Sequence, residues 1–344
     1  MRAQEPGYSR KPSMPGRQTP ARFDLLDILL ERRLDLPGDT LDILIKRGQA
    51  SRSFQVSNPS LLWNKIFPSS WKAKDIKKGE FIDYFIRSFG SGTAGQWLNN
   101  FNARLAHCIE SLNGYYIDRV QGEVLWRLAI GMGASQPFTE TGITLHNLYG
   151  FPYIPGSAAK GATRSFALSD VASKLGIEPL DPVEYDKLKA FNPPRKTPLE
   201  AFETWLDDEN DRALTKLPEE SKKLLSNEDI RREINLFRKI FGTTNLSGQV
   251  LFFDAPPLVQ PKLDKDIMNV HYQEYYQNKG LPADYSEPTL IYFLTVGKGT
   301  VFVFHLASKE QHLLETTKSW LSQAVTQVGI GAKTRVGYGE LRPR

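Results

Sequence analysis

Residues 289–328, TLIYFLTVGKGTVFVFHLASKEQHLLETTKSWLSQAVTQV, carry the strongest fold signal in the chain. Two runs rich in β-branched and aromatic residues, 289–296 and 300–306, flank the turn Gly297-Lys-Gly299. Such runs on either side of a glycine turn predict a β-hairpin. The apolar residues of 311–328 recur instead at helical spacing, which predicts a helix. The stretch therefore combines strands with a helix.

The same mixture continues towards the N-terminus and at the C-terminal end. Residues 123–130 (EVLWRLAI) alternate before a glycine turn, and 248–254 (GQVLFFD) form a compact apolar run, so both predict strands. Residues 157–168 predict a helix that begins directly after Pro155-Gly156, and 338–341 predict a last strand. The order strand, helix, strand, hairpin, helix, strand is that of an α+β fold. It is compatible with a ferredoxin-like sheet that carries large helical insertions.

The composition is that of a globular chain with a modest basic excess. Of the 344 residues 40% are hydrophobic and 24% are charged, which excludes disorder of the whole chain. The single cysteine, Cys108, excludes a disulfide framework and a thiolate metal cluster. No apolar run approaches the roughly 20 residues that span a bilayer, so a membrane protein is not expected. The net charge of +5 permits an anionic partner without requiring one.

Charge and helical patterning divide the chain into regions. Residues 1–22 hold five basic residues against one acid and four prolines, and we expect a disordered basic arm there. Residues 23–115 are predicted to be mainly helical, and 116–344 to form the ferredoxin-like core with a helical insertion at about 170–240. Within that insertion, 205–229 carries eight acids against four basic residues, which is typical of a solvated helical face.

The first candidate site is 153–164, YIPGSAAKGATR. Pro155-Gly156 predicts a turn, and Ser157 is placed to cap the helix that follows. A helix N-terminus presents free N–H groups and a positive dipole end, which suits a phosphate. Lys160 and Arg164 are four residues apart and share one helical face. An ordinary capped helix with two solvated cations would show the same pattern.

The second candidate site is the glycine-rich segment 329–339, GIGAKTRVGYG. Its four glycines allow positive φ and a close approach to another chain. Lys333 and Arg335 lie at its centre, and successive N–H groups in such a turn can form an anion-binding nest. A sharply bent loop with no ligand is the alternative.

Two further segments offer histidines. His146 ends the segment 139–146 (TETGITLH) and is suited to general acid–base work or to a contact with ribose or phosphate; a packed structural histidine is the alternative. His271 lies among the aromatic residues of 266–276 (DIMNVHYQEYY), which can stack on bases or pack a loop against the sheet. Neither segment has the spacing of a metal site, so we expect no metal and no cofactor.

Three blocks in this order carry a family resemblance: 153–164, SGQVLFFDA at 247–255, and GIGAKTRVGYGEL at 329–341. They resemble the RAMP superfamily of CRISPR RNA-binding proteins. With 266–276 between the second and third blocks, the chain is similar to the family of sixth subunits of the type III-B (Cmr) effector complex. The resemblance covers about residues 120–344.

The resemblance implies a ferredoxin-like (RRM-related) RAMP core in a non-catalytic, cytoplasmic RNA-binding subunit. Such a subunit caps the filament of backbone subunits near the 3′ end of the guide RNA and supports target RNA binding in antiviral defence. The implied partners are guide crRNA, target RNA, the backbone RAMP subunit, the small helical subunit and the other terminal RAMP subunit, with no membrane. Target cleavage in that assembly belongs to the backbone subunit. The RNA-binding positions are Gly156, Ser157, Lys160, Gly161 and Arg164, then Gly329, Gly331, Lys333, Arg335, Gly337 and Gly339, with His146 as a further candidate.

Two other functions stay open from the sequence. One is a metal-independent endoribonuclease that processes guide precursor RNA. In that case His146 or His271 would be the general acid or base, and Lys160 or Arg164 would stabilise the transition state. The other is an interaction scaffold that docks partners through the helical N-terminal third and the acidic face 205–229.

Overall fold

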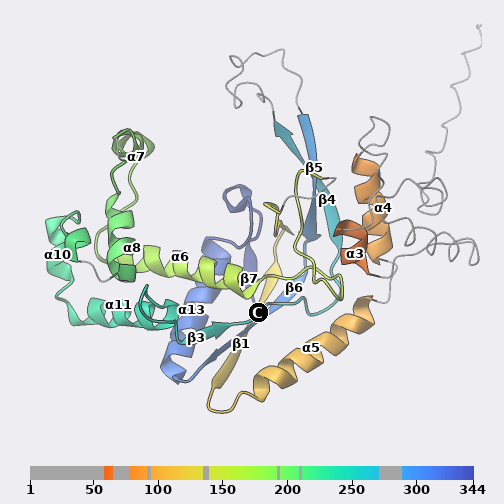
Figure 1. The fold of residues 1–344 in the computed structure, drawn as a ribbon, viewed down its shortest axis with the longest axis horizontal. Coiled ribbons are helices and arrows are strands. Elements are labelled where there is room, and N and C mark those ends of the chain that lie inside the picture. Colours follow the sequence, from red (N-terminus) through yellow and green to blue (C-terminus); the bar gives the residue numbers. More distant parts are fainter. Residues whose placement is uncertain are drawn as a thin grey trace, which may run out of the picture.

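The structure, a computed structural model, describes residues 58–64, 78–90, 94–134, 139–191, 194–208, 211–270 and 289–344. The basic arm 1–22, residues 23–57 of the region predicted to be mainly helical, and His271 all lie outside these residues. Figure 1 shows the arrangement: two sheets at the centre, helices on both sides, and a group of small helices extending to one side. Within the described part, no helix is long and apolar enough to cross a membrane.

The larger sheet has the ferredoxin-like topology that the sequence predicts. Its strand order is β3-β6-β1-β7, with antiparallel pairing between neighbours. One helix follows β1 and another follows β6, so these elements follow one another as β-α-β-β-α-β. The elements are β1 (Tyr116–Val124), α6 (Gly156–Lys174), β3 (Val250–Phe252), β6 (Val301–Ser308), α13 (Gln311–Gln327) and β7 (Leu341–Pro343).

A second sheet has the order β2-β5-β4, where β2 is Arg127–Leu128, β4 is Leu263–Val270 and β5 is Thr289–Gly297. The predicted hairpin is wrong: β5 pairs with β2 and β4, whereas β6 pairs with β1 and β3. The glycine turn is a bend between sheets and not a reversal of direction.

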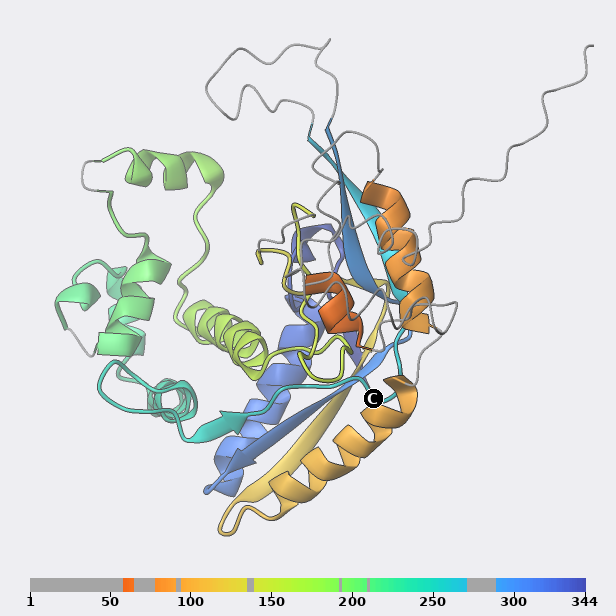
Figure 2. The same ribbon diagram turned by 45° about the vertical axis from the view of Figure 1, so that its right-hand side comes forward.

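The two sheets are joined by one continuous bent ribbon. Glu123 faces Val301 in the larger sheet, and Arg127 faces Gly297 in the smaller one. At the bend, the N–H of Gly299 donates to the carbonyl of Val124 at 2.8 Å, so the segment β1–β2 stays paired with the segment β5–β6 through the bend. Figure 2 shows β1 and β6 running side by side and β5 continuing upwards into the second sheet.

Helices cover the sheets where the strands are apolar. Helices α6 and α13 pack on one face of the larger sheet, where Phe302, Phe304 and Leu306 of β6 are buried. Helix α5 (Ala94–Glu110) lies on the other face, where Asn102 donates to the carbonyl of Pro257 at 3.0 Å. Helices α3 (Pro59–Asn64) and α4 (Lys78–Gly90) pack together, with α4 against β4 and β5.

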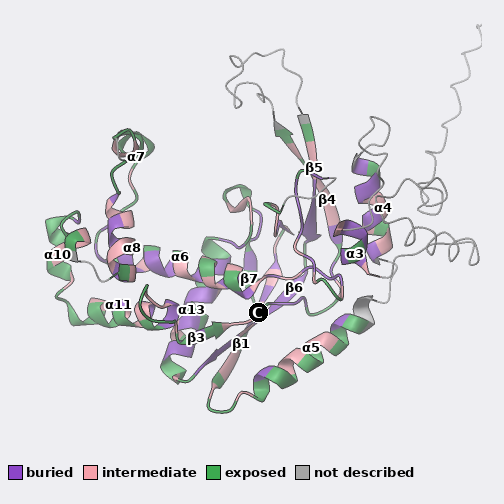
Figure 3. Ribbon diagram, viewed as in Figure 1, coloured by how far each residue is buried: buried purple, intermediate pink, exposed green. Residues whose placement is uncertain are grey.

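A group of helices lies between α6 and β3 in the chain, where the sequence indicated a charged helical insertion. Helix α11 packs on α6 through the buried residues Ile234, Phe237 and Ile240. Figure 3 shows the outer helices of this group, α7 and α10, as largely exposed, in contrast to the buried inner faces of α6 and α13. The five helices are α7 (Pro182–Lys189), α8 (Pro198–Asp208), α9 (Asp211–Leu214), α10 (Glu219–Leu224) and α11 (Glu228–Phe241).

Several predicted boundaries shift in the structure. The described part of the region 23–115, predicted to be mainly helical, contains α3, α4 and α5, and the helix predicted at 311–328 is α13. The strand predicted at 123–130 begins earlier, at Tyr116, and is interrupted at the bend before β2. The strand predicted at 248–254 shortens to β3 (Val250–Phe252), and the strand predicted at 338–341 lies at β7 (Leu341–Pro343).

Candidate functional site

The glycine-rich loop 329–339 connects α13 to β7 and has the unusual backbone that its sequence predicts. Lys333, which is not a glycine, takes the left-handed conformation, with φ 59° and ψ 30°, directly before a short 3-10 turn at Thr334–Val336. A non-glycine residue in this region is uncommon, so the surrounding structure holds it there. The four glycines all have positive φ: 78° at Gly329, 95° at Gly331, 90° at Gly337 and 73° at Gly339.

The glycines of this loop divide into two kinds. A Cβ on Gly331 would lie 2.4 Å from the carbonyl oxygen of Ala129, and one on Gly339 would lie 1.9 Å from that of Ile330. These two glycines therefore allow the loop to approach the protein's own backbone. Gly337 differs, since a Cβ there would meet only the Trp126 ring, at 3.9 Å. The sequence led us to expect that these glycines let the loop approach another chain. At Gly331 and Gly339 they instead let it approach the protein's own backbone.

At the centre of the loop, three N–H groups have no acceptor and two cations have no carboxylate partner among the residues that the structure describes. Among the described residues, the backbone N–H groups of Lys333, Thr334 and Arg335 donate to no acceptor. Arg335 is exposed, and neither it nor Lys333 pairs with a carboxylate in the described part of the chain. The Lys333 ammonium lies 5.4 Å from the centre of the Phe293 ring. Successive N–H groups without a described acceptor, beside two cations without a described carboxylate partner, attract anions.

Asp266 of β4 anchors this loop to the second sheet. Its carboxylate accepts hydrogen bonds from the Tyr338 hydroxyl and from the Arg127 guanidinium. Burial and the bond to Asp266 raise the pKa of Tyr338 to about 12. Burial acts to raise the pKa of Asp266, but its hydrogen bonds outweigh burial and lower it. Sequence reasoning missed Asp266 as an anchor, although it begins the quoted segment 266–276.

The N-terminus of α6 packs against β3 and is already capped. A Cβ on Gly156 would lie 2.2 Å from the carbonyl oxygen of Phe252, so only glycine fits there. The N–H of Gly156 donates to Asp254 Oδ1 at 2.8 Å. The prediction that Ser157 caps the helix is wrong, because this helix has Pro155 at its N-cap and Ser157 lies exposed in the first turn. The Asp254 carboxylate thus occupies part of the position suggested for a phosphate.

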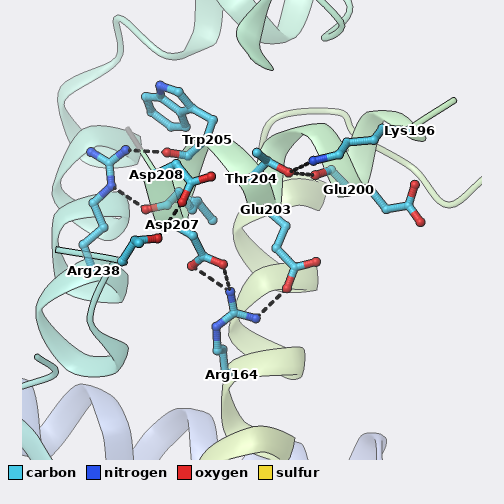
Figure 4. A network of polar contacts seen from close by, with 11 residues as sticks. Arg164, Lys196, Glu200, Glu203, Thr204, Trp205, Asp207, Asp208 and Arg238 are labelled. Atoms are coloured by element: carbon cyan, nitrogen blue, oxygen red, sulfur yellow. Dashed lines mark hydrogen bonds and ion pairs between the residues drawn. The ribbon is translucent and has the colours of Figure 1, made fainter. Parts of the chain in front are cut away.

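Arg164 is engaged in an ion-pair network between α6 and α8. Its guanidinium lies 2.6 Å from a carboxylate oxygen of Glu203 and 2.8 Å from both oxygens of Asp207 (Figure 4). It also lies 5.5 Å from the centre of the Phe237 ring. Burial acts to lower the pKa of Arg164, and the two carboxylates raise it. An RNA contact by Arg164 stays a prediction, with two carboxylates competing for the same donors.

Lys160 is the available cation of this first site. It forms no ion pair with another described residue, and burial together with the charge of Arg164 lowers its pKa. It lines a cavity of about 650 Å³ with Ser157 and the polar residues of the 243–248 turn. Gly161 is exposed with open space around it, so its lack of a side chain serves no contact in the described structure.

His146 is packed among aromatic rings. Its ring centre lies 5.1 Å from those of Phe101 and Phe151 and 4.9 Å from that of Tyr149. Its Nδ1 accepts a hydrogen bond from the N–H of Leu148 at 3.3 Å. Burial lowers the pKa of His146, and the charge of Asp254 acts against this. These contacts favour the packed structural alternative over an acid–base or RNA-contacting one.

The two glycine-containing sites lie at opposite edges of the larger sheet. The loop 329–339 leads into β7 at one edge, and the N-terminus of α6 packs on β3 at the other. No hydrogen bond joins them in the described part of the chain. The two sites are therefore separate, with the inner strands β6 and β1 between the strands that carry them.

Comparison with known proteins gives the family. The family model described as the RAMP superfamily matches residues 90–342. A relative from Pyrococcus furiosus, the CRISPR system Cmr subunit Cmr6, is 34% identical over 231 residues, which are 62% of this chain and 64% of that protein's length.

Two solved structures are also similar. The crystal structure of Cmr6 from Pyrococcus furiosus has a TM-score of 0.45 and 28% identity, and covers 68% of this chain and 99% of that one. A chain in the cryo-EM structure of the type III-B Cmr-beta complex bound to cognate target RNA has a TM-score of 0.47 and 18% identity, and covers 93% of this chain and 94% of that one. The family model matches well over half of the sequence, so this chain belongs to the RAMP superfamily.

Proposed function

We propose that this protein is a non-catalytic RNA-binding subunit of a cytoplasmic type III-B CRISPR (Cmr) effector complex. It caps the filament of backbone subunits near the 3′ end of the guide crRNA and supports target RNA binding. Its neighbours are the backbone RAMP subunit, the small helical subunit and the other terminal RAMP subunit. The similarity to Cmr6 of Pyrococcus furiosus supports this assembly.

The glycine-rich loop is the observation that carries RNA binding. Its unpartnered N–H groups at 333–335, with Lys333 and Arg335 beside them, suit phosphate oxygens and make no demand on base identity. Lys160, at the opposite edge of the sheet, adds a third cation that forms no ion pair with a described residue. Contacts of this kind bind an RNA backbone in a way that tolerates any guide sequence.

The packing of His146 supports a non-catalytic role. A general acid or base must reach the proton it transfers, whereas this imidazole is surrounded by rings and accepts a backbone N–H at Nδ1. We expect no cleavage when the purified chain is incubated with labelled repeat RNA, with or without a chelator. Cleavage that disappears in His146→Ala would replace this proposal with the endoribonuclease.

The binding experiment compares two charge-matched double variants of the full chain. Lys333→Ala with Arg335→Ala removes two cations at the loop, and Lys216→Ala with Lys223→Ala removes two exposed cations from the helical insertion. Affinity for a labelled 20-nucleotide RNA is measured by anisotropy over a salt series. Each lost phosphate contact on single-stranded RNA reduces the salt slope by about 0.7. We therefore expect a weaker affinity and a shallower slope for the loop variant alone.

Two results would contradict the proposal. Equal weakening in both double variants would show that binding follows net charge, with no special role for the loop. A parent chain that binds RNA without salt dependence, or with strong sequence preference, would exclude a backbone-contacting surface. Assembly is tested separately by co-expression with the backbone and small subunits, where the parent chain should co-purify with them and with a discrete small RNA.

A further inference from the structure

Trp126 lies exposed at the bend between the two sheets, next to the glycine-rich loop. It is one of the two residues between β1 and β2, and it is 46% exposed. The Tyr338 ring lies 4.8 Å away, centre to centre, at an angle of 50°. The Arg127 guanidinium lies 5.5 Å from the centre of the indole. The indole is thus supported by the protein without being covered by it.

The backbone on both sides of Trp126 is fixed by hydrogen bonds to the loop. The N–H of Leu125 donates to the carbonyl of Glu340 at 3.1 Å, and the N–H of Gly339 donates to the carbonyl of Arg127 at 2.8 Å. Arg127 is itself bound by Asp266. An aromatic ring held in this way loses little further freedom when a ligand stacks on it.

Gly337 keeps this indole open. It is the loop glycine whose added Cβ would meet nothing closer than Trp126, at 3.9 Å, and its φ of 90° is that of a glycine turn. Its neighbour Arg335 is exposed, and the unpartnered N–H groups at 333–335 belong to the same short loop. Among the acids nearby, Asp264 and Asp266 face Arg127, and Glu340 follows the loop. A flat apolar surface and an anion-attracting backbone therefore lie side by side.

We infer that Trp126 is a stacking platform for one nucleobase of the RNA whose phosphates contact the glycine-rich loop. The inference rests on the proposed RNA-binding function and adds a base contact to it. Every base has a π-face, so stacking on an indole tolerates any sequence, as the phosphate contacts do. The loop would then hold a nucleotide by its phosphate and by its base.

Trp97 provides a matched control. It is also an exposed tryptophan, 54% exposed, and also lies near one tyrosine ring, Tyr149, at 6.4 Å. It belongs to α5, away from the glycine-rich loop. Its removal deletes the same chemical group from a different part of the surface.

The experiment measures anisotropy of labelled 20-mers with the full chain as parent, Trp126→Ala, Trp126→Phe and Trp97→Ala. The probes are oligoadenylate and an RNA backbone of the same length with abasic sites. We expect Trp126→Ala to weaken oligoadenylate binding by about five- to a hundredfold, the range for loss of one stacked base. Trp126→Phe should keep most of the affinity, Trp97→Ala should equal the parent, and the abasic RNA should bind all four proteins alike.

Three outcomes decide the inference. Unchanged oligoadenylate binding by a folded Trp126→Ala overturns it, and so does an equal loss on abasic RNA, while the RNA-binding proposal stands in both cases. Failure of the parent to bind either probe overturns both. If Trp126→Ala does not fold, quenching of tryptophan emission by oligoadenylate is compared in the parent and Trp126→Phe. Quenching that is lost in Trp126→Phe supports the stacking, and quenching that is unchanged overturns it.

Discussion

The two glycine-containing sites are alike in composition and differ in what surrounds them. Each combines glycines with one lysine and one arginine, at 156–164 and at 329–339. At the first, Asp254 accepts a hydrogen bond from the N–H of Gly156 at the helix N-terminus, and two carboxylates of α8 form ion pairs with Arg164. At the second, no described carboxylate pairs with Lys333 or Arg335. The comparison shows that similar basic motifs differ in how far the fold engages them: Arg164 is held by two carboxylates, whereas Lys333 and Arg335 have no described carboxylate partner.

The largest expected effect separates the glycines of the second site. Gly331→Ala places a Cβ 2.4 Å from a carbonyl oxygen at a φ of 95°, whereas Gly337→Ala meets only the strain of positive φ. A left-handed backbone costs an ordinary residue about 1–2 kcal/mol, and the clash at Gly331 adds to this. Denaturant unfolding should show a clearly larger loss of unfolding free energy for Gly331→Ala. Equal losses would mean that the carbonyl of Ala129 moves aside without cost.

The anchor of the second site should give the next largest effect. Asp266→Asn removes a charged acceptor from Tyr338 and Arg127, and charge-assisted hydrogen bonds contribute about 1.5–3 kcal/mol. The pKa of Tyr338 should fall from about 12 towards its ordinary value, which ultraviolet titration of tyrosinate detects as a difference between variant and parent. An unchanged titration would show that burial alone raises that pKa.

A pair of variants tests the contrast at the first site directly. Arg164→Ala leaves Glu203 and Asp207 without their partner, so it should lower the unfolding free energy by about 1 kcal/mol, reduced by solvent screening of the partly exposed carboxylates. Lys160→Ala has no described ion pair to lose and should leave the melting temperature unchanged while it weakens RNA binding. The opposite assignment of the two effects would mean that Arg164 leaves its carboxylates to bind RNA.

The smallest effect concerns His146 and pH. Burial lowers its pKa in the folded state, so the unfolded chain binds the proton more readily. The contribution of His146 to the unfolding free energy should be fully present above the ordinary pKa of histidine. It should be lost as the pH falls below that value. His146→Phe should reduce this slope without abolishing it, because burial also lowers the pKa of His305. An unchanged slope in the variant would assign the whole effect to other groups.

Local patterns in the sequence predicted the local features of this structure. The positive φ of the loop glycines and a helix at 157–168 were both predicted from neighbouring residues, although the observed helix is longer, Gly156–Lys174. The carboxylates that bind Arg164 are 39 and 43 residues away, on a helix whose packing no spacing rule describes. The anchoring of Tyr338 by Asp266, 72 residues away, was missed for the same reason.

The wrong hairpin has a related cause. Two apolar runs around Gly297-Lys-Gly299 fit a reversal and a bend equally well, because the sequence does not say which partner each run meets. The partner strand, β1 with β2, lies more than 150 residues earlier and bends at the same level. Because β6 pairs with β1 and β5 pairs with β2, the segment Gly297-Lys-Gly299 forms a bend between the sheets and not a hairpin turn.

The strand pairing also determines when this protein can fold during its synthesis. β1 comprises residues 116–124, yet both of its partners, β6 and β7, lie more than 170 residues later, within 301–344. β1, an inner strand of the larger sheet, therefore leaves the ribosome well before its partners and stays unpaired at least until residue 301 has been made. Such late, non-local pairing slows folding and exposes strand edges to other chains. A nascent chain that stalls before residue 301 would leave Val120 and Val124, which are buried in the folded sheet, without the partner strands that cover them.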